Sequence, residues 1–199
     1  MTPRAPAMSA EDRRASIIRA ALPLLRKTGA AVTTKEVAVA AGIAEGTLFR
    51  VFPSKEALVE ACVANAFDTA TAVAGLRAID TELPLERRLT AGVEVMREHV
   101  EGVIGLMSVL HATGVQLPRP SDKGRFRGRS AEVDAAFVDL VGPDAERLRF
   151  PVQRVITFLS MLTLASAHPM LPDHGATPAD VVDLLLHGAL ETSKEDPSC

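Results

Sequence analysis

The sequence lacks tryptophan and tyrosine, and aromatic residues make up only 4% of its 199 positions. It also has few runs in which apolar and polar residues alternate, which is the pattern of half-buried β-strands. Apolar residues at helical spacing recur instead along most of the chain. These features predict an all-α protein. A chain of this length buries a substantial core without disulfides or metals to support it.

Cysteine is nearly absent as well, since the chain has only Cys62 and Cys199 and no CxxC motif. Two such residues do not make a disulfide framework, which favours a reducing compartment. The first fourteen residues lack the apolar segment of a signal peptide. The longest apolar run, residues 155–167, is too short to cross a bilayer. We therefore expect a cytoplasmic protein that does not enter a membrane.

Motifs of catalysis and metal binding are missing too. The five histidines show neither HxxxH nor HExxH spacing. The chain contains no G-x-S-x-G motif, no P-loop and no dinucleotide-binding fingerprint. We therefore expect no enzymatic activity, no bound metal and no cofactor.

Charge is distributed unevenly along the chain. The net charge is −3, but residues 1–56 hold nine Lys and Arg against five Asp and Glu, whereas residues 57–199 hold thirteen against twenty. A basic N-terminal quarter on an acidic remainder is expected when one end contacts phosphate. Chance is the alternative that charge alone leaves open.

The N-terminal quarter contains start and stop signals for several short helices. Residues 1–10 are rich in Pro and Ala and are expected to form a disordered arm, and apolar spacing predicts a helix over 11–28. Thr33 and Glu36 form a capping box that begins a two-turn helix ending before Gly42. A second short helix covers 44–52. Three helices at this spacing, the last two joined by a glycine-containing turn, predict a helix-turn-helix.

The rest of the chain is expected to fold as longer helices. Pro53 ends the second short helix, and Ser54 caps the next one. Further helices are predicted at 55–76, 85–113, 131–140, 151–167 and 178–190. Thr177 with Asp180 resembles a second capping box, at the start of the last of these helices. Residues 114–130 are rich in Pro, Gly and Arg, which predicts a loop. Its basic part, 119–129, is either a solvated loop or a nucleic-acid contact.

This organisation predicts about nine helices in two domains. Residues 11–56 form a DNA-binding domain, residues 57–193 form a helical ligand-binding and dimerisation domain, and residues 194–199 form a tail.

The helix at 44–52 has a bare outer face. Leu48 and Phe52 lie four residues apart and point inward, whereas Gly46 and Arg50 lie on the opposite side. A glycine inside a helix costs roughly 1 kcal/mol of helix propensity, which is tolerated where another surface must come close. The DNA major groove admits one helix. The helix starts at 33–35 and 54–55 each place free N–H groups and a lysine where a phosphate can bind.

The stretch "TTKEVAVAAGIAEGTLFRVFPSKEAL", residues 33–58, resembles the N-terminal domain of the tetracycline-repressor (TetR) family of transcriptional regulators. The resemblance covers about residues 13–60. It implies a homodimer that binds a palindromic operator in double-stranded DNA. It also implies a C-terminal helical domain that holds a small-molecule inducer and dimerises through its last two long helices.

The resemblance also assigns roles to residues. It places four residues near base edges: Lys35, Glu45, Gly46 and Phe49. It places five more at positions that contact phosphates or the adjoining groove: Thr33, Thr34, Thr47, Arg50 and Lys55. The sequence departs from the family twice, because the family usually has Tyr at the position of Phe49 and often Ser at that of Ala44. The first change removes a hydroxyl that commonly reaches a phosphate, and the second removes a helix cap.

Candidate residues for the C-terminal domain follow from composition. Seven residues are candidates for an inducer pocket, with ordinary core packing as the alternative: Met96, His99, Met107, His111, Phe137, Phe158 and Met161. Five leucines are candidates for the dimer interface, because apolar residues cover more than one face of the last two helices: Leu159, Leu162, Leu184, Leu185 and Leu186.

The sequence thus predicts a dimeric repressor that a small, mostly apolar ligand releases from its operator. The alternative is a helical small-molecule-binding protein, or an enzyme, that binds no operator.

Overall fold

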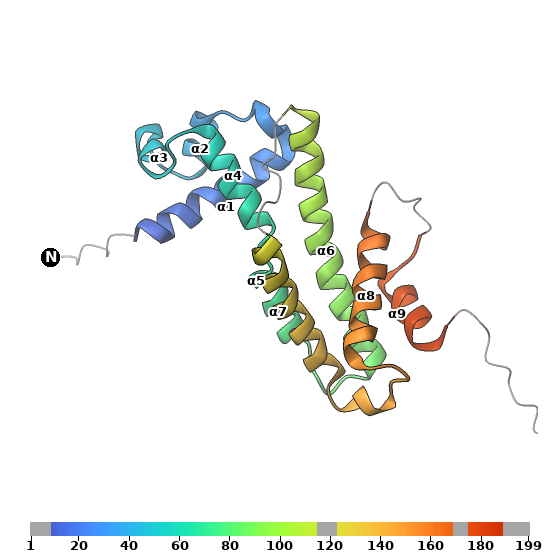
Figure 1. Cartoon of the computed structure of the whole chain (residues 1–199). Helices are drawn as coiled ribbons and strands as arrows, with labels where there is room; N and C mark the ends of the chain where they lie inside the picture. Colours follow the sequence, from blue (N-terminus) through green and yellow to red (C-terminus); the bar gives the residue numbers. More distant parts are fainter. Residues whose placement is uncertain (1–8, 115–122, 169–174, 189–199) are drawn as a thin grey trace, which may run out of the picture. The chain divides into compact units, whose positions relative to one another are not determined.

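The computed structural model describes residues 9–114, 123–168 and 175–188, and over these ranges the chain is helical and has no strand (Figure 1). The predicted all-α class is therefore confirmed. The chain divides into two compact units. The N-terminal unit comprises residues 1–68 and 102–123, and the C-terminal unit comprises residues 69–101 and 124–199. The predicted domain limits, 11–56 and 57–193, stay predictions.

The N-terminal unit is a cluster of short helices around the end of a long one (Figure 1). Its elements are α1 (Ala10–Thr28), the 3-10 turn η1 (Gly29–Ala31), α2 (Thr34–Ala40), α3 (Glu45–Val51), α4 (Lys55–Ala66) and the last part of α6 (Leu85–Ala112). Ser9 caps α1 by accepting a hydrogen bond from the Asp12 N–H at 3.0 Å, so residues 9 and 10 of the predicted arm belong to this helix and its cap. Residues 1–8 lie outside the described ranges.

One apolar core holds this unit together. It joins α1 through Ile17 and Leu25, α3 through Leu48, and α6 through Leu106. Phe52, directly after α3, is completely buried, and the Arg14 guanidinium lies 4.5 Å from its ring centroid. Cys62 of α4 also lies in this core, where burial raises the pKa of its thiol to about 12. That thiol is therefore a neutral packing group.

The C-terminal unit packs five helices around a second core. These are α5 (Ala70–Arg77), the first part of α6, α7 (Lys123–Val141), α8 (Val152–Ala167) and α9 (Pro178–His187), with the 3-10 helix η2 (Gly142–Arg147) between α7 and α8. Each helix contributes a buried side chain to this core: Leu76 from α5, Leu89 from α6, Phe137 from α7, Ile156 from α8 and Val182 from α9. The capping box predicted at Thr177 and Asp180 is confirmed, since the Asp180 N–H donates to the Thr177 hydroxyl at 3.2 Å.

The single helix predicted over 55–76 is wrong, because the structure has α4 and α5 with a break at residues 67–69. Asn65 and Asp68 favour this break, since residues of these two types compete with helical backbone bonding. Residues 55–77 are long and apolar enough to cross a membrane by length and composition alone. The break and the burial of Leu58 and Leu76 in the two cores give this apolar character a packing explanation.

Other helix limits also differ from prediction. Helix α7 begins at Lys123, so the second half of the predicted loop 114–130 is helical, whereas residues 115–122 lie outside the described ranges. Pro151 is the N-cap of α8 rather than its first residue. Helix α9 ends at His187, three residues early, because Gly188 takes φ +84°. The predicted tail, 194–199, is also outside the described ranges.

Candidate nucleic-acid interface

Helices α2 and α3 are joined by a tight turn at Gly42. The Ile43 N–H donates to the Ala38 carbonyl at 2.9 Å, and the Gly42 N–H donates to the Val39 carbonyl at 3.1 Å. This pair of bonds is the Schellman motif, which satisfies carbonyls at the end of α2. The motif needs a residue at positive φ, and Gly42 supplies it with φ +66°. The turn thereby fixes the direction in which α3 leaves α2.

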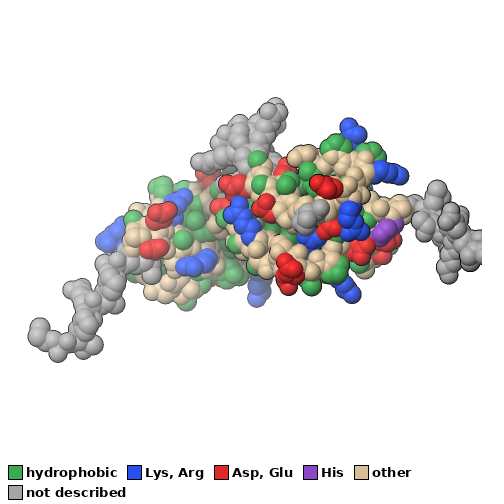
Figure 2. All heavy atoms as spheres, turned by 90° about the horizontal axis from the view of Figure 1, so that it is seen from below, with side chains coloured by type: hydrophobic (Ala, Val, Ile, Leu, Met, Phe, Trp, Pro, Cys, Tyr) green, Lys and Arg blue, Asp and Glu red, His purple; other side chains and the backbone are tan. Residues whose placement is uncertain are grey.

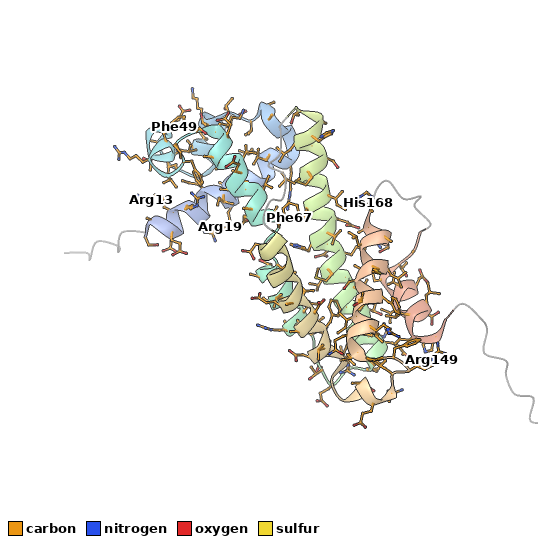
Figure 3. All side chains as sticks on the ribbon, in the orientation of Figure 1. Arg13, Arg19, Phe49, Phe67, Arg149 and His168 are labelled. Atoms are coloured by element: carbon orange, nitrogen blue, oxygen red, sulfur yellow. The ribbon has the colours of Figure 1, made fainter. Side chains whose placement is uncertain are left out.

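Helix α3 has a buried face and an open face, as its sequence predicts. Leu48 and Phe52 are completely buried. On the outer side, a Cβ added to Gly46 meets no atom within 4 Å, and the Arg50 side chain is exposed. Phe49 is 46% exposed, and its label in Figure 3 marks it on this helix. An exposed aromatic ring beside an empty glycine position gives α3 a shallow, partly apolar surface.

The Thr33 hydroxyl, at the start of α2, forms its hydrogen bonds within the helix start. The Glu36 N–H donates to the Thr33 hydroxyl at 3.2 Å, and the Thr33 N–H donates to the Glu36 carboxylate at 2.8 Å. These bonds confirm the predicted capping box. The Thr33 N–H and the Thr33 hydroxyl both donate to the Glu36 carboxylate, which holds the pKa of Glu36 below its usual value. Thr33 therefore has a structural role, and its phosphate contact stays a prediction.

A second internal bond joins α2 to α3. The Thr34 hydroxyl donates to the Glu45 carboxylate at 2.5 Å. The sequence predicts separate DNA contacts for these two residues, yet the structure pairs them with each other. Ala44 provides no side-chain cap for α3, as predicted, and the Glu45 carboxylate instead lies in its first turn. A base contact by Glu45 requires that this bond be shared or exchanged.

Lys55 lies at the start of α4, but its ammonium group is not free. It donates to the backbone carbonyl of Ala30 at 2.5 Å. The N–H of the same residue, Ala30, donates to the Thr113 hydroxyl at 2.9 Å. A single residue in η1 therefore connects the start of α4 with the end of α6, and all three groups belong to the N-terminal unit.

Replacing Lys55 with methionine should lower the free energy of unfolding by about 1.5–3 kcal/mol, the range for a lost hydrogen bond to a charged group. Urea unfolding of the full chain measures this change. Lys27→Met removes the same charge from an exposed position near the end of α1 and should leave stability nearly unchanged. Equal stability of the two variants would contradict the structural role of Lys55. A salt slope of DNA binding that becomes shallower by about one unit in Lys55→Met alone would support its phosphate contact as well.

Two predicted contact residues with a positive charge remain available. Lys35 and Arg50 are exposed, and neither side chain has a hydrogen-bond or ion-pair partner among the described residues. Thr47 is half-buried on α3. Basic and acidic side chains are interspersed over the face seen in Figure 2, without one large patch of a single sign. At α2 and α3, the case for DNA depends on helix geometry and on the exposed cations of Lys35 and Arg50.

The residues predicted for an inducer pocket belong to both units. Met107 and His111 belong to the N-terminal unit, whereas the other five belong to the C-terminal unit. Phe137 is buried in the core, and Phe158 and Met161 are 43% and 62% exposed. The pocket stays a prediction. Among the described residues, no three His, Cys, Asp or Glu side chains are placed to hold a metal ion.

The leucines predicted for a dimer interface divide into two groups. Leu159 lies in the core of the C-terminal unit, and Leu162, Leu185 and Leu186 pack partly against it. Leu184 is 46% exposed. The large exposed apolar side chains of α8 and α9 are those of Phe158, Met161, Leu164 and Leu184. Of the five predicted leucines, Leu184 alone is among these exposed side chains, and the dimer interface stays a prediction.

Short helices around one core, with a tight glycine turn and an exposed face on the second helix of the pair, define a helix-turn-helix DNA-binding domain. Residues 17–62, which span most of this cluster, match the family model of bacterial regulatory proteins of the tetR family. No curated protein sequence matches the chain.

Solved structures of this family share the fold. A tetR-family transcriptional regulator from Streptomyces coelicolor is 23% identical, with a TM-score of 0.56, over 90% of this chain and 79% of that one. The TetR-family regulator PfmR from Thermus thermophilus is 16% identical, with a TM-score of 0.53, over 86% and 97%. The superantigen pfit also matches, with 18% identity and a TM-score of 0.55 over 93% and 92%. Because a fold alone does not assign a function, the family model over 17–62 carries the assignment. Residues 17–62 thus match the DNA-binding domain of TetR-family regulators, and the chain shares the fold of solved members of that family, as the sequence predicts.

Proposed function

We propose that the chain is a dimeric repressor that inserts α3 into the major groove of a palindromic operator and is released by a small ligand. The observation that carries the proposal is the outer face of α3, which is open at Gly46 and exposes Phe49 and Arg50. A helix with no bulky side chain at Gly46 on its outer face fits the DNA major groove, which admits one helix. Lys35 from α2 adds a free cation beside it.

A homodimer through α8 and α9 would place two such helices on one duplex. Four large apolar side chains are exposed on these helices: Phe158, Met161, Leu164 and Leu184. Exposed apolar patches of this kind commonly mark a protein interface. Two copies of α3 must then meet successive major grooves, about 34–36 Å apart.

Release of the operator follows as a shift between two states of the dimer. A ligand that binds better to the state in which the two α3 helices no longer match the grooves favours that state, by no more than its differential affinity. The proposal places this protein in the cytoplasm and assigns it no catalytic role.

The proposal is tested by selecting binding sites from a pool of random duplexes with the full chain. A repressor of this kind should enrich a palindromic sequence and give a discrete complex in a gel shift at moderate salt. A helical ligand-binding protein or an enzyme would enrich nothing. Enrichment of an unrepeated half-site would contradict the dimeric arrangement and retain DNA binding.

Replacing Gly46 with alanine should stabilise the free protein and weaken operator binding. The new methyl group meets no atom within 4 Å, and Ala in a helix gains about 0.5–1 kcal/mol over Gly. If the groove lies against this face, affinity should fall roughly ten- to hundredfold, the range of one lost base contact. Gel-shift titration and urea unfolding measure the two effects.

Gly105→Ala is the matched control, because Gly105 lies in α6 with no atom near its added Cβ. It should give the same gain in stability with unchanged DNA affinity. If Gly46→Ala and Gly105→Ala bound DNA with equal affinity, α3 would not lie in the DNA interface.

A further inference from the structure

A cavity of about 900 Å³ lies within the C-terminal unit, away from the residues predicted for the inducer pocket, and its lining includes three leucines predicted for the dimer interface, Leu184, Leu185 and Leu186. Its lining comes from the segment before α6 and its first turns, from η2, from the segment before α8, and from the end of α9. The apolar part of the wall includes Leu85, Leu148, Phe150, Val155 and Leu185. This volume is in the range of pockets that enclose small organic molecules, about 300–1,000 Å³.

A cluster of charged side chains forms another part of the wall. Arg88 is only 2% exposed and forms an ion pair with Asp144. The same carboxylate accepts from the Arg147 Nη1 at 2.5 Å. Because one carboxylate serves two guanidinium groups, the three side chains keep a net positive charge. Hydrogen bonds from Arg147 and then Arg88 lower the pKa of Asp144, which keeps its carboxylate ionised.

Arg88 is also short of hydrogen-bond acceptors. Its Nε and Nη1 atoms are buried and have no partner among the described residues. A buried guanidinium with unmet donors is unfavourable unless an acceptor reaches it. Arg149, which lines the same cavity and is labelled in Figure 3, adds a further positive charge. The other carboxylate of the lining, that of Glu86, lies 3.6 Å from the His187 Nε2.

We propose that this cavity binds an amphipathic carboxylate, with its head group beside Arg88 and Arg147 and its apolar body against the leucines and Phe150. An anion balances the surplus charge, and a carboxylate forms the strongest class of hydrogen bond with a guanidinium. A neutral apolar molecule fills the same volume but leaves the charge uncompensated. Binding at this cavity is independent of the proposed repressor function, and only a role in releasing DNA rests on it.

The test uses the full chain with sodium dodecanoate and dodecan-1-ol, below the concentration at which either aggregates. Isothermal titration should show saturable binding of one dodecanoate per chain and at least tenfold weaker binding of the alcohol. Arg147→Gln, at an exposed side chain that should not disturb folding, should weaken dodecanoate binding about tenfold. Arg77→Gln removes an equal charge from α5, outside the cavity, and should change nothing.

Arg88→Met removes the central cation, and it should abolish dodecanoate binding in a chain whose circular dichroism matches that of the parent. If this variant does not fold, Arg147→Gln decides the question. Absence of saturable binding, equal binding of acid and alcohol, or equal affinity of Arg147→Gln and the parent would each overturn the proposal. A gel shift in the presence of dodecanoate separates the two functions, since binding without release of DNA leaves the cavity assignment intact and removes only its regulatory role.

Discussion

Replacing Phe52 with alanine should lower the free energy of unfolding by about 3–5 kcal/mol, the cost of removing a buried aromatic ring. Phe52 is completely buried in the core that joins α1, α2, α3 and α4. The substitution leaves a cavity beneath α3 and also removes the ring that the Arg14 guanidinium covers at 4.5 Å. Urea unfolding of the full chain, followed by far-UV circular dichroism, measures the change.

Phe49→Ala makes the same chemical change three residues away, but it should affect operator affinity rather than stability. Phe49 is 46% exposed, so its loss should cost less than about 1 kcal/mol of stability. Its ring lies on the proposed DNA face, so operator affinity should fall although the protein stays folded. Equal destabilisation by the two substitutions would contradict the inward and outward assignment of these phenylalanines.

The features predicted correctly from sequence depend on neighbours along the chain. The capping boxes at Thr33 and Thr177 need only a partner three residues away. The buried face of α3 follows from Leu48 and Phe52 at a spacing of four. Such interactions have few alternatives, because the chain cannot form the helix without bringing these groups together.

The contacts that sequence reasoning missed join residues far apart. Lys55 and Ala30 are 25 positions apart, and Ala30 and Thr113 are 83 apart. A lysine at a helix start has the same sequence pattern whether it binds a phosphate or a carbonyl of its own chain. Only the folded arrangement brings the end of η1 within reach of Lys55, so no local pattern assigns this bond.

The burial of Arg88 could not be predicted from local sequence either. Its place in a helix gives it the appearance of a solvated surface residue, since arginine is rarely buried without a partner. Its partner Asp144 lies 56 positions later, in η2. The apolar excess on the last two helices likewise predicted an interface region, but which of Phe158 and Leu159 faces outward depends on how α8 packs against its neighbours.

Replacing Gly29 with alanine should destabilise the protein by about 2–6 kcal/mol, from backbone strain and overpacking together. Gly29 has φ +55° and ψ −132°, a conformation that residues with a side chain rarely adopt. An added Cβ would lie 2.5 Å from the Thr113 hydroxyl and 2.9 Å from the Val109 carbonyl. Because the second neighbour is backbone, η1 and the end of α6 must separate. We expect the Ala30–Thr113 hydrogen bond to be lost, which faster amide exchange at Ala30 would detect.

Gly42→Ala separates strain from overpacking in this prediction. Gly42 has φ +66°, but its added Cβ meets nothing within 4 Å, so only the backbone cost of about 1–2 kcal/mol applies. The difference between the two variants combines the close contact of α6 with η1 and the more restricted backbone conformation of Gly29, whose ψ is −132°. If Gly29→Ala cost no more than Gly42→Ala, the close approach of Thr113 and Val109 would not persist in solution. The connection from α6 through Ala30 to Lys55 and the start of α4 would then have no structural basis, whereas the helix-turn-helix itself, built on Leu48 and Phe52, would be unaffected.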